Sequence, residues 1–466
     1  MDEVKDNPLG YAPIGKLIFK YATPSILSLL VSATYNIVDQ VFIGNIVGMY
    51  ANGATNVSFP LVTFCAAMAL MIGAGSAANF NINMGAGKKD EAARYAGTGL
   101  TMIVVFGVFM AAVSLIFTRS LMRAFGATYN MLDLAVRYTR ITAIGFPFQM
   151  FSHACSNLIR ADGRPTYSMI STVAGSVTDI VLNYVFMVPM QMGFDGAAYS
   201  TIIGQFVSSM MVLGYMLRFR SVKLTAPLLI PRLKYFKGII KLGLSNFINH
   251  FVMTLVQITM NRVFKQYGAV SVYGSDIPLA VAGVIAKINS IFIAFTVGTA
   301  QGCQPIHGFC TGAKKYDRVK ATYKRALVFV LAFSVLAFCG FQLFPREIVS
   351  IFGRGRDLPP GMVETYFRFA EQYMRIFMMM ACIFGIQPLT VNFFAATGKA
   401  KQGIFLSLAR QGLFLLPLLL ILPMFMGLNG ALISGPIADF LAVVFCITLM
   451  VREFRRLTAL QNESAK

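Results

Sequence analysis

The segment VPMQMGFDGAA at residues 188–198 recurs as LPMFMGLNGAL at residues 422–432. Two further pairs of segments recur in the same order: NMGAGKKDEAARYA at 83–96 with FCTGAKKYDRVKAT at 309–322, and NLIRADGRP at 157–165 with NFFAATGKA at 392–400. Chance similarity between apolar segments is common, but ordered matches that include loop glycines, lysines and prolines are not. The sequence is therefore a tandem repeat of two related halves.

Each half consists mainly of apolar runs long enough to cross a bilayer. The 466-residue chain is 56% hydrophobic and 13% charged, whereas soluble domains average about 45–50% apolar and about 25% charged residues. Runs of roughly twenty apolar residues match a hydrocarbon core about 30 Å thick. Such runs can only be helices, because lipid cannot satisfy backbone polar groups. Twelve spans are predicted, at 16–43, 56–80, 96–117, 138–159, 167–189, 195–217, 242–264, 279–305, 324–345, 366–393, 402–423 and 430–450.

The net charge of +21 indicates membrane orientation rather than nucleic-acid binding, because Lys and Arg form short clusters between the apolar runs. With the N-terminus inside, 27 of the 40 Lys and Arg residues fall in cytoplasmic segments and 10 in outer ones. This bias predicts a multi-pass plasma (inner) membrane protein with both termini in the cytoplasm. The N-terminal residues lack the features of a cleaved secretory signal, so the first helix is expected to remain as an anchor.

Six spans in each half give both halves the same orientation, which predicts two lobes related by a pseudo-twofold axis along the membrane normal. The expected fold is an all-α integral membrane protein with twelve transmembrane helices. Its predicted parts are an N-terminal lobe at 1–217, a cytoplasmic linker at 218–241, and a C-terminal lobe with a cytoplasmic tail at 242–466. Two lobes joined by a tether favour rocking about a central cavity. That arrangement is typical of a solute transporter, not of a receptor or a membrane enzyme.

Several motifs resemble the multidrug and toxic compound extrusion (MATE) transporters: VDQVFIG at 38–44, GAGSAANFNINMGAGKKDEA at 73–92, its counterpart GTAQGCQPIHGFCTGAKKYDRV at 298–319, and RADGRP at 160–165. The resemblance covers residues 16–456. It implies a two-lobe, twelve-helix antiporter. Such an antiporter exports cationic or amphipathic organic compounds against an inward flow of protons or sodium.

Two polar stripes point to cation coupling in the first lobe. The residues of each stripe are three or four apart and therefore share one helix face: Ser25, Ser28, Ser32, Asn36 and Asp39 on the first helix, and Thr172, Ser176, Asp179 and Asn183 on the fifth. Lipid cannot satisfy such stripes, so both are expected to line the lobe interior and to approach each other. Two carboxylates that lie close together in a low-dielectric interior repel each other when both are ionised, which favours proton binding by one of them. Asp39 and Asp179 are therefore the predicted proton-binding residues, with Asn36 and Asn183 beside them.

The alternative for Asp39 is a capping role near the outer end of its helix. The repeat argues for coupling, because Asp39 corresponds to Asn261 and Asp179 corresponds to Leu413. The second half thus lacks both charges, which is expected if the first lobe alone is specialised for cation coupling.

The resemblance to the family includes one departure. Proton-coupled and sodium-coupled members typically carry Asn and then Asp, four residues apart, on the fifth helix. Here the order is Asp179 and then Asn183, which moves the charge by one turn, about 5.4 Å. The carboxylates that similar transporters use on the seventh helix are missing from NFINHFVMTLVQ at 246–257. The resemblance therefore favours protons over sodium as the coupling ion.

Other intramembrane charges have two open interpretations. Asp439 and Lys287 lie at similar depth in the second half, and they are predicted to form either a structural ion pair or a second substrate or proton site. Glu371 and Arg375 have the i, i+4 spacing of an intrahelical pair.

The predicted substrate-binding residues combine the two carboxylates with nearby polar and thioether side chains: Asp39, Asp179, Gln40, Asn157 and Met253. Flexible methionines suit a pocket that accepts varied compounds. Pro24 is a predicted hinge because it shares a helix with Asp39, the alternative being a static kink.

The expected partners are small organic cations and the lipid bilayer, with no nucleic acid. The expected state is a monomer, without a cofactor or a metal. No nucleophile–base arrangement, zinc spacing or Walker loop occurs, so an enzyme is not predicted. Two alternatives are a sodium-coupled drug antiporter and a lipid-linked oligosaccharide flippase of the same superfamily. A flippase needs a basic cavity, and the interiors of the predicted helices carry only Lys287, Arg375 and Arg410 as basic residues.

Overall fold

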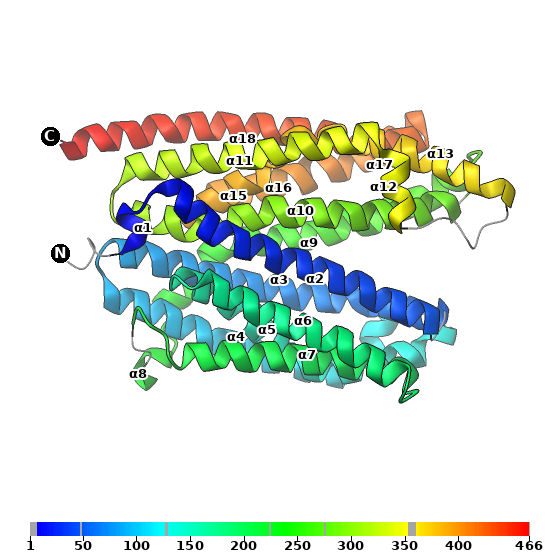
Figure 1. Cartoon of the computed structure of the whole chain (residues 1–466), viewed down its shortest axis with the longest axis horizontal. Helices are drawn as coiled ribbons and strands as arrows, with labels where there is room; N and C mark the ends of the chain where they lie inside the picture. Colours follow the sequence, from blue (N-terminus) through cyan, green and yellow to red (C-terminus); the bar gives the residue numbers. More distant parts are fainter. Residues whose placement is uncertain are drawn as a thin grey trace.

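The computed structural model describes residues 7–46, 49–125, 129–222, 225–274, 276–352 and 360–465. Within these ranges the chain is helical and contains no strand. The helices run roughly parallel to one another and form two layers, one from each half of the sequence (Figure 1).

Six long helices form the first lobe, the lower layer of Figure 1. They are α2 (Ile14–Ile46), α3 (Met49–Gly85), α4 (Lys89–Ala124), α5 (Tyr129–Ala161), α6 (Pro165–Met187) and α7 (Gly193–Met216). The short helices α1 (Pro8–Tyr11) and α8 (Ala226–Leu229) flank this lobe in the sequence.

The second lobe repeats this arrangement with two interrupted helices. Its elements are α9 (Leu233–Ala269), α10 (Asp276–Gly312), α11 (Tyr316–Leu343), α12 (Pro345–Phe352), α13 (Pro360–Phe377), α14 (Ala381–Phe384), α15 (Ile386–Ala396), α16 (Ala400–Leu408), the π-helical turn η2 (Ala409–Leu415), α17 (Leu416–Met426) and α18 (Leu428–Ala465). The chain bends by 42° between Met362–Phe377 and Ala381–Ala396, so the tenth span is broken near Met378–Met380. The eleventh span contains the π-helical turn.

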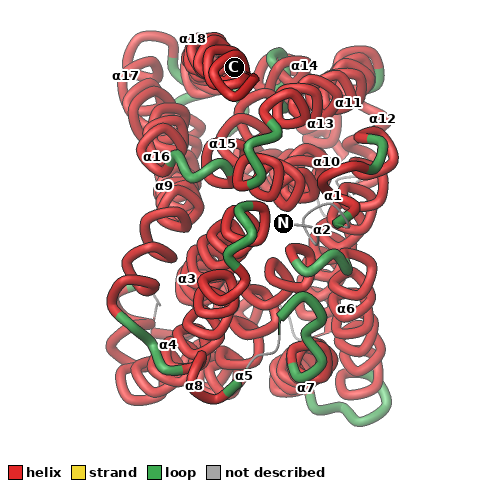
Figure 2. Tube along the Cα trace, turned by 90° about the vertical axis from the view of Figure 1, so that its left-hand side faces the viewer, coloured by secondary structure: helices red, strands yellow, loops and turns green. Residues whose placement is uncertain are grey.

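All twelve predicted spans coincide with these helices. Ten helices are long and apolar enough to cross a membrane, and the bent pair is an eleventh candidate. Helix α5 completes the two-lobe bundle. Its first turns carry Asp133, Arg137 and Arg140, which lower its apolar content. Helix α1, the end of α18 and the basic loops α3–α4 and α10–α11 lie at one end of the bundle, here called the basic end (Figures 1 and 2).

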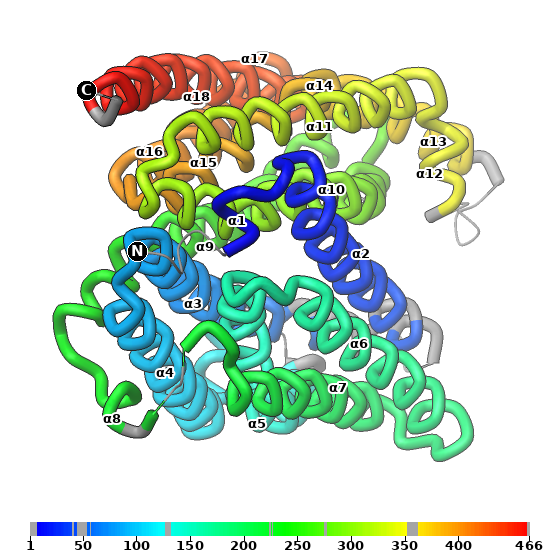
Figure 3. Tube along the Cα trace, turned by 60° about the vertical axis from the view of Figure 1, so that its left-hand side comes forward, coloured from blue at the N-terminus to red at the C-terminus, as the bar shows by residue number. Residues whose placement is uncertain are grey.

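The lobes pack against each other along two equivalent helix pairs, α2 with α10 and α3 with α9. Glycines allow the backbones to approach closely. A Cβ atom built at Gly243 would lie 1.9 Å from the carbonyl oxygen of Met71, and one built at Gly302 would lie 2.5 Å from the Cα of Ala22. These contacts lie in the half of the bundle nearest the basic end, whereas the opposite ends of the lobes diverge (Figures 1 and 3). We call this set of contacts the basic-end seal.

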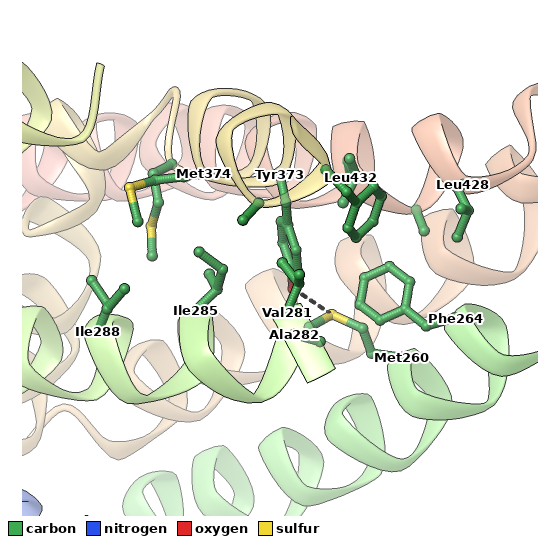
Figure 4. Close-up of a cluster of buried hydrophobic side chains, with 14 of the residues drawn as sticks. Met260, Phe264, Val281, Ala282, Ile285, Ile288, Tyr373, Met374, Leu428 and Leu432 are labelled. Carbon is green, nitrogen blue, oxygen red and sulfur yellow. Dashed lines mark hydrogen bonds between the residues drawn. The ribbon is translucent and has the colours of Figure 1, made fainter. Parts of the chain in front are cut away.

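Each lobe has an apolar core, and a further buried cluster joins α2 of the first lobe to α10, α11, α15 and α18 of the second. In the second lobe, side chains from α9, α10, α13 and α18 meet around Tyr373, which is fully buried (Figure 4). The Tyr373 hydroxyl lies 4.0 Å from the sulfur of Met260, and its ring packs against Phe264 with the centroids 5.4 Å apart. Buried aromatic pairs of this kind add to the stability that burial provides. These four helices therefore form one packed unit around Tyr373.

Candidate functional site

The interior of the first lobe contains a polar cavity between four helices. It is lined by Ser32 and Tyr35 from α2, Gln149, Ser152 and His153 from α5, Thr172, Gly175, Ser176 and Asp179 from α6, and Thr201, Gly204, Gln205 and Ser208 from α7. Residues from both predicted polar stripes are among these. Small residues make room for the cavity, because a Cβ at Gly175 or Gly204 would collide with the facing helix. We call this space the first-lobe cavity.

Beside the cavity, Asn183 connects Asp39 to α6 and α7. Its amide nitrogen donates to Oδ1 of Asp39 over 2.8 Å, which joins α6 to α2. Its amide oxygen accepts a hydrogen bond from the Ser200 hydroxyl at 2.9 Å, which adds α7. Asn183 is 1% exposed, so this chain of hydrogen bonds lies inside the lobe. The reversed order of Asp179 and Asn183 thus places the amide, rather than the second carboxylate, against Asp39.

Asp179 lies one turn away and has a different environment. The residue is 3% exposed, and neither carboxylate oxygen has a hydrogen-bond partner among the described residues. The hydroxyls of Ser200 and Thr201 are nearby, and Asp39 lies within electrostatic range. A buried, unpartnered carboxylate is costly when it is ionised. Asp179 is therefore the least satisfied acidic group in the first-lobe cavity.

Two tyrosines surround these carboxylates and were missed by the sequence interpretation. Tyr35 lines the cavity, and both Tyr35 and Tyr138 lie within electrostatic range of Asp39 and Asp179. Tyr35 precedes Asp39 by four residues, so helical spacing alone could have identified it. Tyr138 comes from α5 and has no such signal, because its position depends on how α5 packs against the other helices of the lobe, where its ring stacks on Phe194 of α7.

The other residues predicted for ion coupling are placed less centrally. Asn36 is exposed, and its amide donates to the Ser32 carbonyl on its own helix at 2.7 Å. The side chain of Gln40 falls outside the described residues. Pro24 lies inside the uninterrupted helix α2, and the Ser28 hydroxyl donates to its carbonyl oxygen at 2.8 Å.

Arg160 and Asn157 form a second polar site, at the basic-end seal. Arg160 is 8% exposed, and its guanidinium donates to Oδ1 of Asn157 at 2.7 Å. It also lies 3.5 Å from Oε1 of Gln301 on α10, so it bridges the two lobes. In the part of the chain that is described, Arg160 has no carboxylate partner. The sequence interpretation counted Arg160 as a loop cation, but it is a buried residue in the last turn of α5, which ends at Ala161 rather than at residue 159.

The repeat places a similar contact in the second lobe. Asn392, the counterpart of Asn157, accepts a hydrogen bond at Oδ1 from Gln304 at 2.6 Å. Each asparagine also donates to the carbonyl four residues earlier, Asn157 to His153 and Asn392 to Pro388. The scaffold is therefore shared by the two lobes, and the arginine is the feature particular to the first.

The predicted pairing of Asp439 with Lys287 is wrong. Asp439 on α18 accepts a hydrogen bond from Nε of Arg410 at 2.5 Å, and both side chains are buried. The Arg410 guanidinium also lies over the ring of Phe384, 4.6 Å from its centroid. Arg410 belongs to the π-helical turn η2, which alters the direction of side chains in that span. The sequence predicted how deep Asp439 lies in the membrane, but not the direction in which its side chain points.

The structure also places Glu371 and Met253 differently from the sequence prediction. Glu371 contacts Arg346 on α12 at 3.5 Å, so the predicted intrahelical partner Arg375 is replaced by one from another helix. Met253 is 41% exposed on α9, outside the first-lobe cavity. Among the described residues, no group of three or more His, Cys, Asp or Glu side chains could hold a metal ion.

Comparisons with known proteins agree with this architecture. The MatE family model matches residues 24–185 and 247–421, one stretch in each half. Similar curated relatives include the multidrug export protein MepA of Staphylococcus aureus (strain MSSA476), 21% identical over 464 residues and covering 99% of each chain. MepA of Staphylococcus haemolyticus (strain JCSC1435) is 21% identical over 459 residues and covers 98% of each chain.

Solved structures of similar fold extend over almost the whole chain. A MATE protein crystallised in complex with MaL6 matches with a TM-score of 0.89 at 21% identity, over 98% of this chain and 99% of that one. A MOP superfamily transporter from Pyrococcus furiosus, whose binding pocket is described as having reverse polarity, matches with a TM-score of 0.88 at 21% identity, over 97% and 98%. Because the family model covers more than half of the sequence, the chain belongs to the MATE family of transporters.

Proposed function

We propose that this protein is a proton-coupled antiporter that exports organic cations by alternating access. The observation that carries the proposal is the pair of carboxylates in the first lobe: Asp39 accepts a hydrogen bond from Asn183, and the buried Asp179, which lines the first-lobe cavity, has no hydrogen-bond partner among the described residues. The function of the named relatives as multidrug exporters supports the substrate class. The bias of basic residues supports a cytoplasmic location for the basic end.

The coupling step follows from the difference between the two carboxylates. An ionised Asp179 without partners is costly in a low-dielectric interior, and binding a proton removes that cost. Proton binding at Asp39 weakens its hydrogen bond with Asn183, because hydrogen bonds to charged acceptors are about twice as strong as neutral ones. That bond connects α2 with α6. Loading protons therefore loosens α2, the helix that also packs on α10 in the other lobe.

Alternating access needs a contact that holds one side closed and can be released. The basic-end seal supplies such a contact, since glycine-mediated packing and the Arg160–Gln301 contact join the lobes there. In our proposal protons enter from the open side, α2 shifts, and the lobes rock so that the basic end opens. Substrate from the cytoplasm then replaces the protons and is carried outward.

The energetics require only a few protons. One charge moving through 100 mV supplies about 2.3 kcal/mol. A tenfold concentration gradient of drug costs about 1.4 kcal/mol. Export of a singly charged cation moves one charge outward, so two protons per cation leave a net gain of about 2.3 kcal/mol per 100 mV, which is sufficient for a tenfold gradient.

Sodium coupling is a second candidate with one observation in its favour. The two oxygens of Asp179, which have no hydrogen-bond partner among the described residues, and the nearby carboxylate of Asp39 are ligands of the hard type that small cations prefer. The same assay separates the two coupling ions.

The test is ethidium transport in proteoliposomes, driven either by a proton gradient alone or by a sodium gradient alone. We expect the proton gradient to drive the wild type, and Asp179→Asn and Asp39→Asn to lose this transport. The matched control is Asp133→Asn, whose carboxylate is 85% exposed and pairs with Arg119. This control should transport normally.

Each other outcome changes the conclusion. A requirement for sodium replaces the proton with sodium as the coupling ion. Normal proton-driven transport by both carboxamide variants removes the coupling site from the first lobe. If ethidium moves under neither gradient, the drug-export proposal fails and the lipid-linked oligosaccharide flippase takes its place.

A further inference from the structure

A basic groove lies outside both sites, between α11 and the C-terminal part of α18. Its lining combines three cations, one carboxylate, polar side chains and an apolar floor: Lys320, Lys324, Arg455, Asp317, Thr458, Gln461, Ala321, Val451 and Phe454. We call it the α11–α18 groove. It belongs entirely to the second lobe and shares no residue with the first-lobe cavity.

The groove lies where two apolar runs end. The run in α11 begins at Ala326, just after Lys324, and the run in α18 ends at Met450, just before Val451. Helix α18 has 38 residues and is about 57 Å long at 1.5 Å per residue, well beyond a hydrocarbon core of about 30 Å. The groove therefore occupies the headgroup region of the leaflet at the basic end, with its apolar floor nearest the hydrocarbon.

The walls of the groove are held in place by contacts between the two helices. Nζ of Lys320 donates to the Thr458 hydroxyl at 3.0 Å and to Oε1 of Gln461 at 2.9 Å. Phe454 packs edge-on against Tyr323, with ring centroids 5.6 Å apart, and Nζ of Lys324 lies 6.0 Å from its ring centroid. The groove is thus a shaped feature and not a chance gap between mobile side chains.

The positive charge of the groove is not neutralised from within the protein. Across the described ranges, Lys320, Lys324 and Arg455 form no ion pair with a carboxylate. Glu453 of α18, next to the groove residue Phe454, is buried and pairs with Lys399 instead. Asp317 offsets one of the three cations, so the lining keeps a net charge of about +2.

We propose that the α11–α18 groove binds an anionic phospholipid, with its phosphate between Lys320, Lys324 and Arg455 and its glycerol and upper acyl chain on Val451 and Phe454. Basic pockets between membrane helices on the cytoplasmic side recognise anionic headgroups. The apolar floor can in addition contact an acyl chain, which a phospholipid has and free phosphate lacks. The proposal does not depend on which compound or ion the transporter moves.

The absence of tryptophan from the chain provides a direct test. Phe454→Trp places a single reporter in the groove, and lipids brominated near the headgroup end of their acyl chains quench it on contact. Phe425→Trp, at a position that is 81% exposed on α17, is the reporter for ordinary lipid contact. We expect brominated phosphatidylglycerol to quench the groove reporter at a mole fraction at least about fivefold lower than brominated phosphatidylcholine does. The Phe425 reporter should show no such preference.

The charge dependence is tested with two double variants in the Phe454→Trp background. Lys320→Gln with Lys324→Gln should abolish the preference for phosphatidylglycerol. Lys88→Gln with Arg94→Gln removes two cations at the basic end of the first lobe, where Arg94 is the repeat counterpart of Lys320, and should leave the preference intact. Equal quenching by both lipids overturns the proposal. A preference that survives in the groove variant, or that is lost in both variants, also overturns it.

The source of the anion is tested by adding inorganic phosphate against sodium chloride of the same ionic strength. We expect the two salts to weaken the preference equally, since both act by screening. If phosphate alone abolishes it, the groove binds free phosphate and the lipid assignment is wrong.

Discussion

The side-chain amide of Asn183 donates to Oδ1 of Asp39 over 2.8 Å and so joins α6 to α2 inside the first lobe. This contact is the link between a carboxylate that can bind a proton and a helix that packs against the other lobe. A change at Asn183 should therefore affect coupling more than it affects folding.

We expect Asn183→Ala to fold and to lose most proton-driven ethidium transport. In this variant Asp39 has no hydrogen bond to α6 that its protonation could weaken, so proton binding no longer affects the contact between α2 and α6. Loss of a hydrogen bond to a charged acceptor costs about 1.5–3 kcal/mol, so a modest fall in thermal stability should accompany it. Asn36→Ala is the matched control, since that exposed amide contacts only its own helix. Equal transport by the two alanine variants would contradict the role given to Asn183.

Arg160→Met should weaken the basic-end seal. The variant removes the guanidinium that contacts Asn157 and Gln301 and leaves a buried amide oxygen without its donor, at a cost of about 1–3 kcal/mol. Hydrogen exchange of α10 near Gln301 should then be faster than in the wild type. Arg164→Met is the control, because Arg164 is an exposed residue of the next loop. Unchanged exchange in Arg160→Met would show that the seal does not rely on this arginine.

Gly243 should tolerate no side chain when the basic end is closed. A Cβ at this position would lie 1.9 Å from the Met71 carbonyl oxygen, so Gly243→Ala should shift the population toward forms in which α3 and α9 have separated. We expect transport to fall at least tenfold and thiol reagents to gain access from the basic end. Gly214→Ala meets no atom within 4 Å and should be neutral or stabilise the protein by up to about 1 kcal/mol. A Gly243→Ala variant with normal transport would show that the close contact is not needed.

The pair of Arg410 and Asp439 distinguishes structural from functional ions in the second lobe. Asp439→Asn leaves Arg410 buried without its counter-charge, and we expect a loss of about 3–5 kcal/mol in the free energy of unfolding. The double variant Arg410→Met with Asp439→Leu should recover that stability, because apolar replacements often match a buried ion pair. Ethidium transport by the double variant separates the roles. Activity near wild type indicates a structural pair, and a stable but inactive protein indicates a second binding site.

Much of the architecture could be predicted from the sequence. Apolar runs predicted all twelve spans, and the recurrence of NLIRADGRP as NFFAATGKA predicted two related halves. The three- and four-residue spacing of the polar stripes predicted that Asp39 and Asp179 would approach each other inside the first lobe. They lie within electrostatic range of each other, with Asp179 lining the first-lobe cavity and Asp39 beside it. Tyr35 follows the same spacing and was within reach of the same reasoning.

The partners of the buried charges could not be predicted. Arg410 reaches Asp439 because a π-helical turn and the broken tenth span bring η2, α14 and α18 together. Arg160 was assigned to a loop because it follows an apolar run, yet α5 continues past it and the seal between the lobes buries it. Neither a helix irregularity nor a contact between lobes leaves a periodic signal.

The sequence by itself determined which segments cross the membrane, how the halves are related and which helix faces are polar. These properties depend on each residue's affinity for water or hydrocarbon and on helical spacing, and both are local. The tertiary structure alone decided that Asn183 rather than Asp179 contacts Asp39, that Arg410 pairs with Asp439, and that Arg160 is buried at the basic-end seal. Those contacts depend on the rotation and distance of helices far apart in the chain, which only the packing of the two lobes sets.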